Sequence, residues 1–583
     1  MQGNRAQTGS PLAPRLRAVE PPLDEMVRGP ARTRVADAIV QTLLELNVDS
    51  FYGIPGGAIA SLYDALLDYP KARLINTRHE TSAAFMAMGH SRVGASLPCV
   101  LMTSGPGITN VMTGLAAAYA EGIPLIAIGG EVPKKNFGRG ALQEGSRYQL
   151  DVLGMVRSVT KYAAEITNPR AATTVVRKAV ATALSGKQGP VFLSLPLDVA
   201  NEKISLVRMS TQVSTRFEVD DEVMDGAAEA LQRAKRGLII VGSGARHPEA
   251  VRLIGALAST LQLPVVTTPK AKGLFPENDP LSLGVFGLGG HPSASEYLEQ
   301  GIDTVLCVGC GLGETGTNSW SPLLQASRAF IQIDIDAAQI GKNYTVDHGL
   351  VGPAHVLLRG LVSRVHRRSA PAASYGIRHH PMTGPAESSE GLNPPAVLQT
   401  LQELMPKETI YVSDIGEHTI HALHYLRVDA PDGFMAHTGL GSMGSGIGSA
   451  IGARHARPDR PVVAVCGDYG FQMHGMELAT CVHHGIGTVF AVFNDRRMRM
   501  VEAGQSKVFG RSGMMHSHRV DFAALARSVG AVGYSIRTLE DLRRLPADLG
   551  QGNVPVVLDI EISPRAVFPV NGRVAQIRHF SAE

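Results

Sequence analysis

Short apolar runs alternate with segments of helical period along most of the chain. SFYGI, LPCVLMT, PLIAIGG and PVFLSLP are examples, and each run ends near glycines or small polar residues. Such runs are typical of buried strands, and strands that alternate with helices build parallel sheets covered by helices on both faces. The pattern predicts an α/β protein with three doubly wound parallel-sheet domains, at residues 31–205, 206–366 and 393–565.

Changes in composition mark the segments outside these domains. Residues 367–392 are rich in Pro, Ser and Gly, which predicts a linker. Residues 1–30 are rich in Pro, Arg and Gly and contain no acid before Glu20, which favours a disordered tail, with a transit peptide as the alternative. Residues 566–583 are expected to form a C-terminal tail.

The charge balance and the cysteine content limit the partners and the location. The net charge of the 583 residues is +3, so we expect neither a nucleic-acid nor a membrane partner. Five cysteines indicate a reducing, cytoplasmic environment. Cys307 and Cys310 form a C-x-x-C without two further ligands at comparable spacing, so we interpret them as small buried residues and not as a zinc site.

Two apolar runs of the third block are followed by acidic residues. PVVAVC leads into Gly467 and Asp468, and TVFAVF leads into Asn494 and Asp495, which lies 27 residues after Asp468. One strand–helix–strand crossover would place both acids at the same sheet edge, where α/β proteins bind ligands. Oxygen ligands at such an edge suit Mg²⁺, although Gly-Asp and Asn-Asp also begin helices as simple caps.

This spacing resembles the thiamine diphosphate motif of the acetolactate synthase and pyruvate oxidase family. The resemblance extends from about residue 33 to 564, and the order of the three domains agrees with it. The segments that most resemble family blocks are FYGIPGGAIASLYDAL, INTRHETSAAFMAMGHSR, TSGPGITNVMTGLAAAY and HTGLGSMGSGIGSAIGA.

The resemblance implies a role for individual residues. Glu80 would hydrogen-bond N1′ of the cofactor's aminopyrimidine and so favour loss of the C2 proton, and Gln143 would face the reacting carbonyl. The side chains of Asp468 and Asp495 and the carbonyl of Arg497 would bind Mg²⁺. The expected cofactor-binding residues are Gly57, Glu417, His418, Gly441, Met443, Gly467, Tyr469, Gly470 and Met500.

Within that set, Met443 would hold the cofactor in a bent shape, and Gly441 would offer a carbonyl to the pyrimidine amine. Glu417 departs from the family, which has Gln before the His, and an anion there repels a diphosphate unless it is protonated or paired. Because the activating acid and the metal motif of this family meet across a subunit interface, the resemblance implies a homodimer or homotetramer that acts on small 2-oxo acids.

Other departures bear on the reaction. Position 57 is Gly where simple 2-oxo acid decarboxylases have an acid, and the loop at 136–145 has no His, so no acid is evident to release an aldehyde. Addition to a second carbonyl, with pyruvate giving 2-acetolactate or a related acyloin, is therefore favoured. Leu197, Gly504 and the segment 311–320 replace features that serve FAD and second-substrate selection in biosynthetic synthases, so we expect no FAD.

Three alternatives remain open at the level of sequence. They are a 2-oxo acid decarboxylase of the same family, a non-catalytic regulatory homologue, and a dehydrogenase built on GSGARHPE (242–249), which lacks the last glycine of G-x-G-x-x-G. We interpret the remaining histidines that could suggest zinc as ordinary surface or packed residues, and these are His421, His424, His516 and His518.

Overall fold

The computed structural model describes residues 32–205, 217, 220–368 and 373–569. The predicted tail at 1–30 and most of the predicted tail at 566–583 lie outside these residues. The chain divides into two compact units, residues 1–216 and 217–583. The first holds one six-stranded parallel sheet and the second holds two, which confirms the predicted class of three parallel-sheet α/β domains. The domain boundaries stay predictions.

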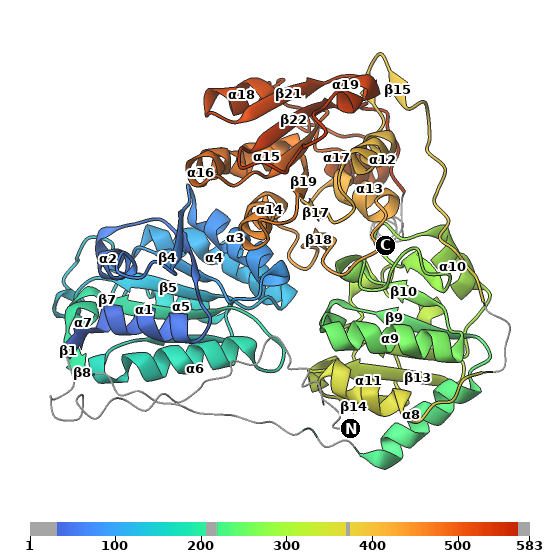
Figure 1. Cartoon of the computed structure of the whole chain (residues 1–583), viewed down its shortest axis with the longest axis horizontal. Helices are drawn as coiled ribbons and strands as arrows, with labels where there is room; N and C mark the ends of the chain where they lie inside the picture. Colours follow the sequence, from blue (N-terminus) through green and yellow to red (C-terminus); the bar gives the residue numbers. More distant parts are fainter. Residues whose placement is uncertain (1–31, 206–216, 218–219, 369–372, 570–583) are drawn as a thin grey trace, which may run out of the picture. The chain divides into compact units, whose positions relative to one another are not determined.

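The sheet of the first unit lies between two layers of helices (Figure 1). In spatial order its strands are β3 (Arg73–Asn76), β2 (Ser50–Gly53), β4 (Cys99–Met102), β5 (Ile126–Glu131), β7 (Val191–Pro196) and β6 (Tyr162–Glu165). The main helices are α1 (Val35–Glu45), α2 (Ala60–Leu66), α3 (Glu80–Val93), α4 (Pro106–Glu121), α5 (Val152–Arg157), α6 (Ala172–Leu184) and α7 (Leu197–Asn201). Helices α1 and α6 pack on one face through an apolar core, and α3 and α4 cover the other.

The central sheet has a different strand order. Its strands run β11 (Ser282–Val285), β10 (Val265–Thr267), β9 (Gly237–Val241), β12 (Thr304–Val308), β13 (Ala329–Asp334) and β14 (His348–Val351). Its helices are α8 (Asp221–Arg233), α9 (Pro248–Leu261), α10 (Pro292–Glu299) and α11 (Ala354–Val362). Numbered along the chain, the strands read 3-2-1-4-5-6, the order of dinucleotide-binding folds.

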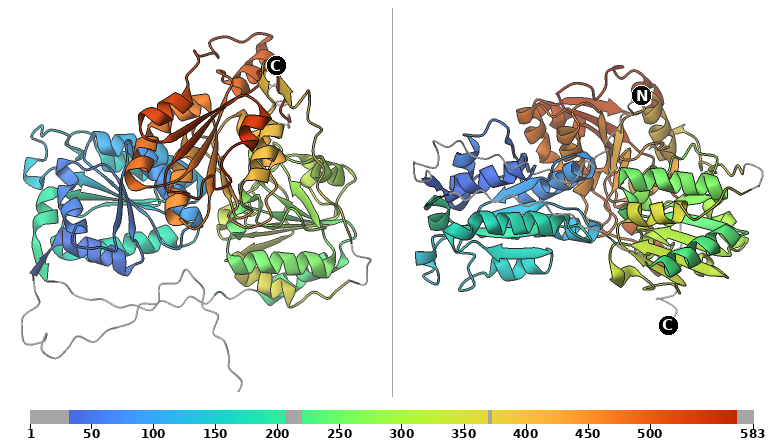
Figure 2. Two further views of the ribbon diagram at one scale, coloured as in Figure 1. Left: turned by 45° about the horizontal axis from the view of Figure 1, so that its top comes forward. Right: turned by 60° about the horizontal axis from the view of Figure 1, so that its bottom comes forward.

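The third sheet carries the predicted metal motif. Its strands run β18 (Phe434–Ala436), β17 (Ile410–Ser413), β19 (Val462–Gly467), β20 (Val489–Asn494), β22 (Val556–Glu561) and β21 (Val532–Ile536). Its helices are α12 (Pro394–Leu404), α13 (Glu417–Tyr425), α14 (Ser445–Ala456), α15 (Asp468–His474), α16 (Leu478–His484), α17 (Arg499–Phe509), α18 (Phe522–Ser528) and α19 (Leu539–Arg543). Figure 2 shows helices on both faces of this sheet.

Two short ladders lie outside the three sheets. β1 (Arg32–Arg34) pairs with β8 (Lys203–Ser205), and β15 (Glu387–Ser388) pairs with β16 (Gly391–Leu392). The second ladder falls within the predicted linker, and Leu392 is buried in the core of the third domain, so the end of that segment belongs to the domain and not to a free linker.

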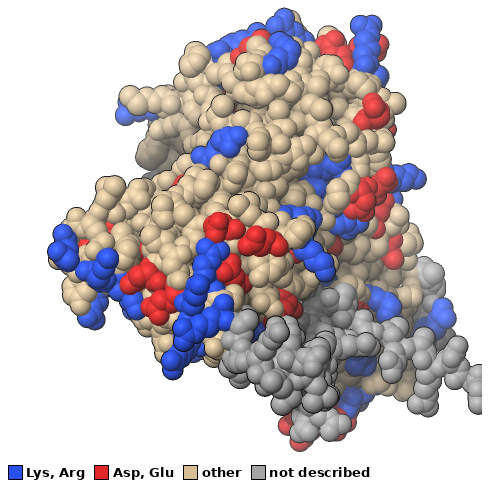
Figure 3. Space-filling model, turned by 60° about the vertical axis from the view of Figure 1, so that its left-hand side comes forward, with Lys and Arg blue, Asp and Glu red and all other residues tan. Residues whose placement is uncertain are grey.

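The surface charges and the composition of the helices bear on the prediction that the protein has no nucleic-acid or membrane partner. On the face shown in Figure 3, lysines and arginines are interspersed with aspartates and glutamates. None of the helices in the described part of the chain combines the length and the apolar composition that crossing a bilayer requires.

Candidate active site

The two acids of the predicted metal motif follow neighbouring strands. β19 and β20 pair in parallel, and a crossover through α15 and α16 joins them, which confirms that Asp468 and Asp495 share one sheet edge. Asp468 Oδ2 accepts a hydrogen bond of 2.7 Å from the backbone N–H of Arg496, so the two strand-end loops are tied together. Asn494 points elsewhere, because its amide donates to Val520 O and Asp559 Oδ1.

Burial makes both carboxylates costly to ionise. The pKa of Asp468 is raised to about 6, chiefly because the carboxyl is removed from water. The pKa of Asp495 is raised to about 8 by burial and, secondarily, by the nearby charges of Asp468 and Glu417. A divalent cation between oxygen donors would relieve this repulsion, so the donor set fits Mg²⁺.

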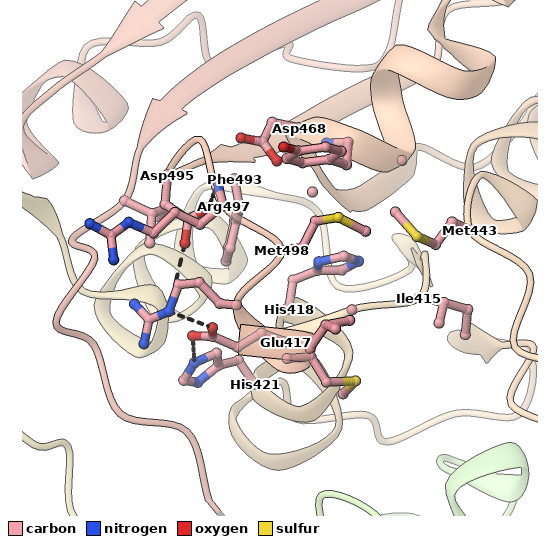
Figure 4. A pocket seen from close by; sticks show the side chains of 18 of the residues that line it. Ile415, Glu417, His418, His421, Met443, Asp468, Phe493, Asp495, Arg497 and Met498 are labelled. Atoms are coloured by element: carbon pink, nitrogen blue, oxygen red, sulfur yellow. Dashed lines mark hydrogen bonds and ion pairs between the residues drawn. The ribbon is translucent and has the colours of Figure 1, made fainter. Parts of the chain in front are cut away.

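A cavity of about 270 Å³ opens at this edge of the sheet (Figure 4). Figure 4 shows Met443 and Ile415 across the cavity from Asp495. Every residue of the third domain that the sequence assigned to the cofactor or the metal lines it, and these are Glu417, His418, Gly441, Met443, Gly467, Asp468, Tyr469, Gly470, Asp495, Arg497 and Met500. The assignments of individual roles stay predictions.

His418 supplies an unused polar atom at the cavity wall. Its ring is buried, and Nε2 has no hydrogen-bond partner among the described residues. Burial lowers the pKa of His418 to about 3, so the ring is neutral at physiological pH. A Cβ at Gly467 would lie 3.2 Å from the ring, so the ring packs closely against the backbone at the end of β19.

The glycine-rich loop that carries Gly441 and Met443 is held by a residue that the sequence analysis did not assign. Asp414 follows β17 and is fully buried. Its two oxygens accept hydrogen bonds from the N–H groups of Gly444 (2.9 Å) and Gly446 (3.0 Å). Its position after a strand was visible in the sequence, but its partners lie thirty residues further along.

Glu417 lines the cavity but its carboxylate is already engaged. Oε1 accepts a hydrogen bond of 3.1 Å from His421 Nε2, and Oε2 lies 2.9 Å from Arg499 Nε. Of the two conditions that the sequence set for an acid at this position, protonation or pairing, the structure provides pairing.

Glu80 lies in the first unit, as the first residue of α3. The residue is only 6% exposed, so Glu80 is not an ordinary surface glutamate. The side-chain amide of Asn110 donates to Glu80 Oε2 at 3.0 Å, which fixes the carboxylate from the neighbouring helix α4. The structure therefore gives Glu80 a defined orientation on a rigid element.

The two other residues that the sequence assigned in the first unit are exposed. Gly57 begins a short 3₁₀ turn after β2, and no atom lies within 4 Å of the position where its Cβ would stand. Gln143 has a positive φ of 62° and packs against Gly105, whose own φ is 59°. Their predicted contacts with cofactor and substrate stay predictions.

The central domain uses its glycines for close packing of the backbone. A Cβ at Gly242 would lie 2.3 Å from Gly309 O, and one at Gly287 would lie 2.1 Å from Thr315 O. Cys307 and Cys310 are both buried, as expected, and the Cys307 thiol donates to Cys310 O. These glycines need no bound dinucleotide to explain them.

Comparison with known proteins agrees with this arrangement. Three family models match in order: the thiamine pyrophosphate enzyme N-terminal TPP binding domain at residues 33–151, the central domain at 224–361 and the C-terminal TPP binding domain at 414–560. A benzoylformate decarboxylase from Polynucleobacter necessarius has the same fold, with a TM-score of 0.81 at 24% identity over 92% of this chain and 100% of that one.

Relatives of higher identity span nearly the whole chain. A probable acetolactate synthase large subunit from Methanocaldococcus jannaschii is 31% identical over 93% of this chain and 94% of its own length. An acetolactate synthase from Mycobacterium bovis is 31% identical over 92% and 89%. The chain therefore belongs to the thiamine diphosphate-dependent enzymes and is acetolactate synthase-like within that family.

Proposed function

We propose that the protein is a thiamine diphosphate- and Mg²⁺-dependent carboligase that decarboxylates one 2-oxo acid and joins the remainder to a second carbonyl. Pyruvate giving 2-acetolactate is the default reaction. The observation that supports the proposal most is the pair of buried carboxylates, Asp468 and Asp495, beside the unpartnered Nε2 of His418 in one cavity. Acetolactate synthases are also the relatives that span the chain.

The residues of the cavity divide into those that would hold the metal and those that would hold the cofactor. Asp468, Asp495 and the carbonyl of Arg497 would bind Mg²⁺, and His418 would contact the diphosphate. Met443, across the cavity, offers an apolar surface to the middle of the cofactor. When bound, thiamine diphosphate supplies a carbon nucleophile that adds to the 2-oxo acid and accepts the electron pair left by CO₂.

Glu80 would hold the proton that the aminopyrimidine ring exchanges at N1′. Its role requires a carboxyl group that is fixed and shielded from bulk water, and the burial of Glu80 and its bond to Asn110 meet this requirement. Gln143, on its exposed turn, would face the carbonyl of the substrate.

The residues at the positions where simple 2-oxo acid decarboxylases are expected to carry proton donors favour carboligation over simple decarboxylation. Position 57 is a glycine with open space around it, and the loop from Asn136 to Gly145 has no histidine. With no group in these places to protonate the carbon left after CO₂ departs, that carbon is available to a second carbonyl compound.

We also propose that the working enzyme is a homodimer or homotetramer. The activating acid lies in one compact unit of the chain and the metal motif in the other, and in the family that the sequence resembles these two meet across a subunit interface. Light scattering of the purified protein with thiamine diphosphate and Mg²⁺ measures the assembly, and an active monomer would contradict it.

The test of the proposed function is a product analysis. The purified chain, thiamine diphosphate and Mg²⁺ are incubated with single and paired 2-oxo acids, and products are identified by mass spectrometry. We expect 2-hydroxy-2-methyl-3-oxo acids or related acyloins. Release of aldehyde alone would support the decarboxylase alternative, and the absence of any cofactor-dependent product would overturn the proposal.

A further inference from the structure

Three side chains form a buried charged group at the wall of the cavity. Glu417 at the start of α13 lies between His421 on the same helix and Arg499 at the start of α17. The exposed fractions of these side chains are 11%, 0% and 12%. In Figure 4 the Glu417 carboxylate points toward His421 and away from Asp468, so it does not face the metal motif.

Arg499 joins this group to two other parts of the domain. Its Nε lies 3.7 Å from Asp495 Oδ2, on the loop after β20. Its Nη1 donates to Ser563 O at 3.0 Å, and Nη2 donates to Ala566 O, both in the segment after β22. One guanidinium therefore contacts α13, the metal loop and the segment that follows the last strand.

The charges around the cavity show why such a cation matters. Three carboxylates line it, those of Glu417, Asp468 and Asp495, and a single divalent cation offsets only two of them. The third negative charge would lie beside an incoming diphosphate in a site that is shielded from water, where like charges repel strongly. Arg499 is the guanidinium that lies within ion-pair distance of both Glu417 and Asp495.

We propose that Arg499 is a positioning residue that offsets the charge of Glu417 and thereby allows the diphosphate of thiamine diphosphate to bind beside it. The inference rests on the proposed function. According to this proposal, Glu417 orients Arg499 and does not contact the cofactor. The two residues together are neutral, as the amide of a glutamine at position 417 would be.

This inference predicts a specific pattern of non-additivity between two substitutions. Arg499→Gln leaves Glu417 uncompensated in the cavity and weakens binding of thiamine diphosphate by at least about tenfold, the scale for unpairing a buried charge. Glu417→Gln alone removes the charge that needed offsetting and changes the affinity by less than about threefold. The double variant Glu417→Gln/Arg499→Gln returns to within about threefold of the unchanged protein.

The experiment is a calorimetric titration of the full chain with thiamine diphosphate at saturating Mg²⁺. Arg519→Gln is the matched control, because it removes the same charge from the same domain where Arg519 pairs with Glu561 at 3.8 Å, away from the cavity lining. We expect this control to bind as the unchanged protein does. Thermal unfolding of each apoprotein verifies that the variants fold.

A second variant keeps the inference testable if Arg499→Gln does not fold. Arg499→Lys retains the positive charge but not the planar fork that reaches Ser563 and Ala566. We expect its affinity to stay within about tenfold of that of the unchanged protein, and a Lys variant that loses more than this would overturn the inference.

The remaining outcomes separate the inference from the proposed function. If the double variant binds as weakly as Arg499→Gln, Arg499 acts on the ligand or the fold directly and the inference is overturned. An unchanged affinity of Arg499→Gln overturns it as well, while the proposed function stands. If the unchanged protein binds no thiamine diphosphate, the proposed function fails and the inference with it.

Discussion

The first and third sheets have the same strand order but carry different chemistry at the same edge. Numbered along each domain, both read 2-1-3-4-6-5. The fourth strand of each ends at an acid: Glu131 is the last residue of β5, and Asp495 directly follows β20. Burial raises the pKa of both carboxyl groups. Topology therefore accounts for where the acids lie but not for what they do.

The difference lies in the neighbours of each acid. Glu131 Oε1 accepts two backbone hydrogen bonds, from Val132 N (2.8 Å) and Gly145 N (3.1 Å). Asp495 accepts one, from Arg497 N, and shares its cavity with Asp468, whose charge raises its pKa further. Glu131 does not line the cavity, whereas Asp468 and Asp495 repel each other inside it and so make a site for a cation.

The largest expected effect is at the metal motif. Asp468→Ala should weaken Mg²⁺-dependent binding of thiamine diphosphate by more than about 100-fold, because the cation that bridges to the diphosphate loses a ligand that carries charge. Calorimetric titration with metal present measures the affinity. Normal affinity in this variant would contradict the metal-site assignment.

Its counterpart in the first domain is the matched control. Glu131→Gln removes the acid at the end of β5, the strand equivalent to β20, and Gln still accepts the two backbone hydrogen bonds. We expect the affinity for cofactor to stay within about threefold of that of the unchanged protein. Any effect of the substitution should appear as a lower thermal stability. Equal loss of affinity in both variants would show that the distinction between the two edges is wrong.

The second-largest expected effect is at Glu80, the acid of the first domain to which we assign a catalytic role. Glu80→Gln should leave folding and cofactor affinity largely intact and lower turnover by about 100-fold or more, the scale for losing a positioned proton-transfer group. Exchange of the C2 proton of bound cofactor, followed by NMR, should slow with it. Glu45→Gln, on the surface helix α1 of the same domain, is the control, and unchanged C2 exchange in Glu80→Gln would remove Glu80 from this role.

The residues around the cavity of the third domain differ in how far the sequence could predict them. The acids after β19 and β20 were predictable because apolar runs mark buried parallel strands, and the ends of neighbouring strands meet. The roles of Asp414 and Arg499 could not be predicted from the sequence, because their partners lie far away along the chain and the contacts depend on loop geometry. Strands β6 and β21 lack a fully buried apolar run, since they lie at sheet edges, and no sequence pattern marked them.

The second unit also holds a group of packed histidines that the first unit lacks. His424 Nε2 accepts a hydrogen bond from the backbone of His380 (2.8 Å), and its Nδ1 donates to Gly290 O (3.1 Å). His291 and His379 both donate to His424 O. A proton added to His424 Nε2 would face the backbone N–H of His380, from which this nitrogen now accepts its hydrogen bond.

Acid should therefore act on this group of histidines. Burial, chiefly, lowers the pKa of His424 to about 3, and the pKa values of His291 and His379 are lowered for the same reason, with Lys272 adding repulsion. Because these histidines take up protons near pH 6.5 in the unfolded chain and not in the folded chain, their contribution to stability is complete above that pH and falls as the pH decreases. The raised pKa values of Asp468 and Asp495 give a contribution of the opposite sign, so the histidine contribution is read at α13, which carries His424. For His424 alone the loss is about 2 kcal/mol at pH 5.

Hydrogen exchange followed by mass spectrometry measures this difference between the units. Between pH 7.5 and 5, after correction for the intrinsic exchange rate, amides of α13 should lose protection before those of α1. His424→Gln should be less stable at neutral pH but should show a shallower dependence on pH. Parallel loss of protection in both helices would contradict the assignment of the acid sensitivity to these histidines.

The central domain bears on the prediction that the protein binds no FAD, which stays a prediction. Glycines 242, 287 and 289 lie in loops of this domain, and Gly242 and Gly287 pack against the segment CGLGETG (310–316). In the structure Leu288 N donates to Thr315 O at 2.8 Å, and Gly289 packs against Leu423, so backbone occupies the space near these glycines. The segment also contains no arginine and no aspartate pair to meet a flavin.

The smallest expected effect is accordingly that of added FAD. The purified protein should be colourless between about 350 and 500 nm, and carboligation after exhaustive dialysis should need only thiamine diphosphate and Mg²⁺. Addition of FAD should leave the rate unchanged, whereas omission of Mg²⁺ in the same assay should abolish it. A stoichiometric flavin spectrum, or activity that returns only with FAD, would mean that residues 310–316 leave a flavin site open. The central domain would then bind a ligand at the ends of its strands, as the third domain is proposed to do. The distinction between a central domain whose strand ends are filled by protein and a third domain with an open cavity would then be wrong.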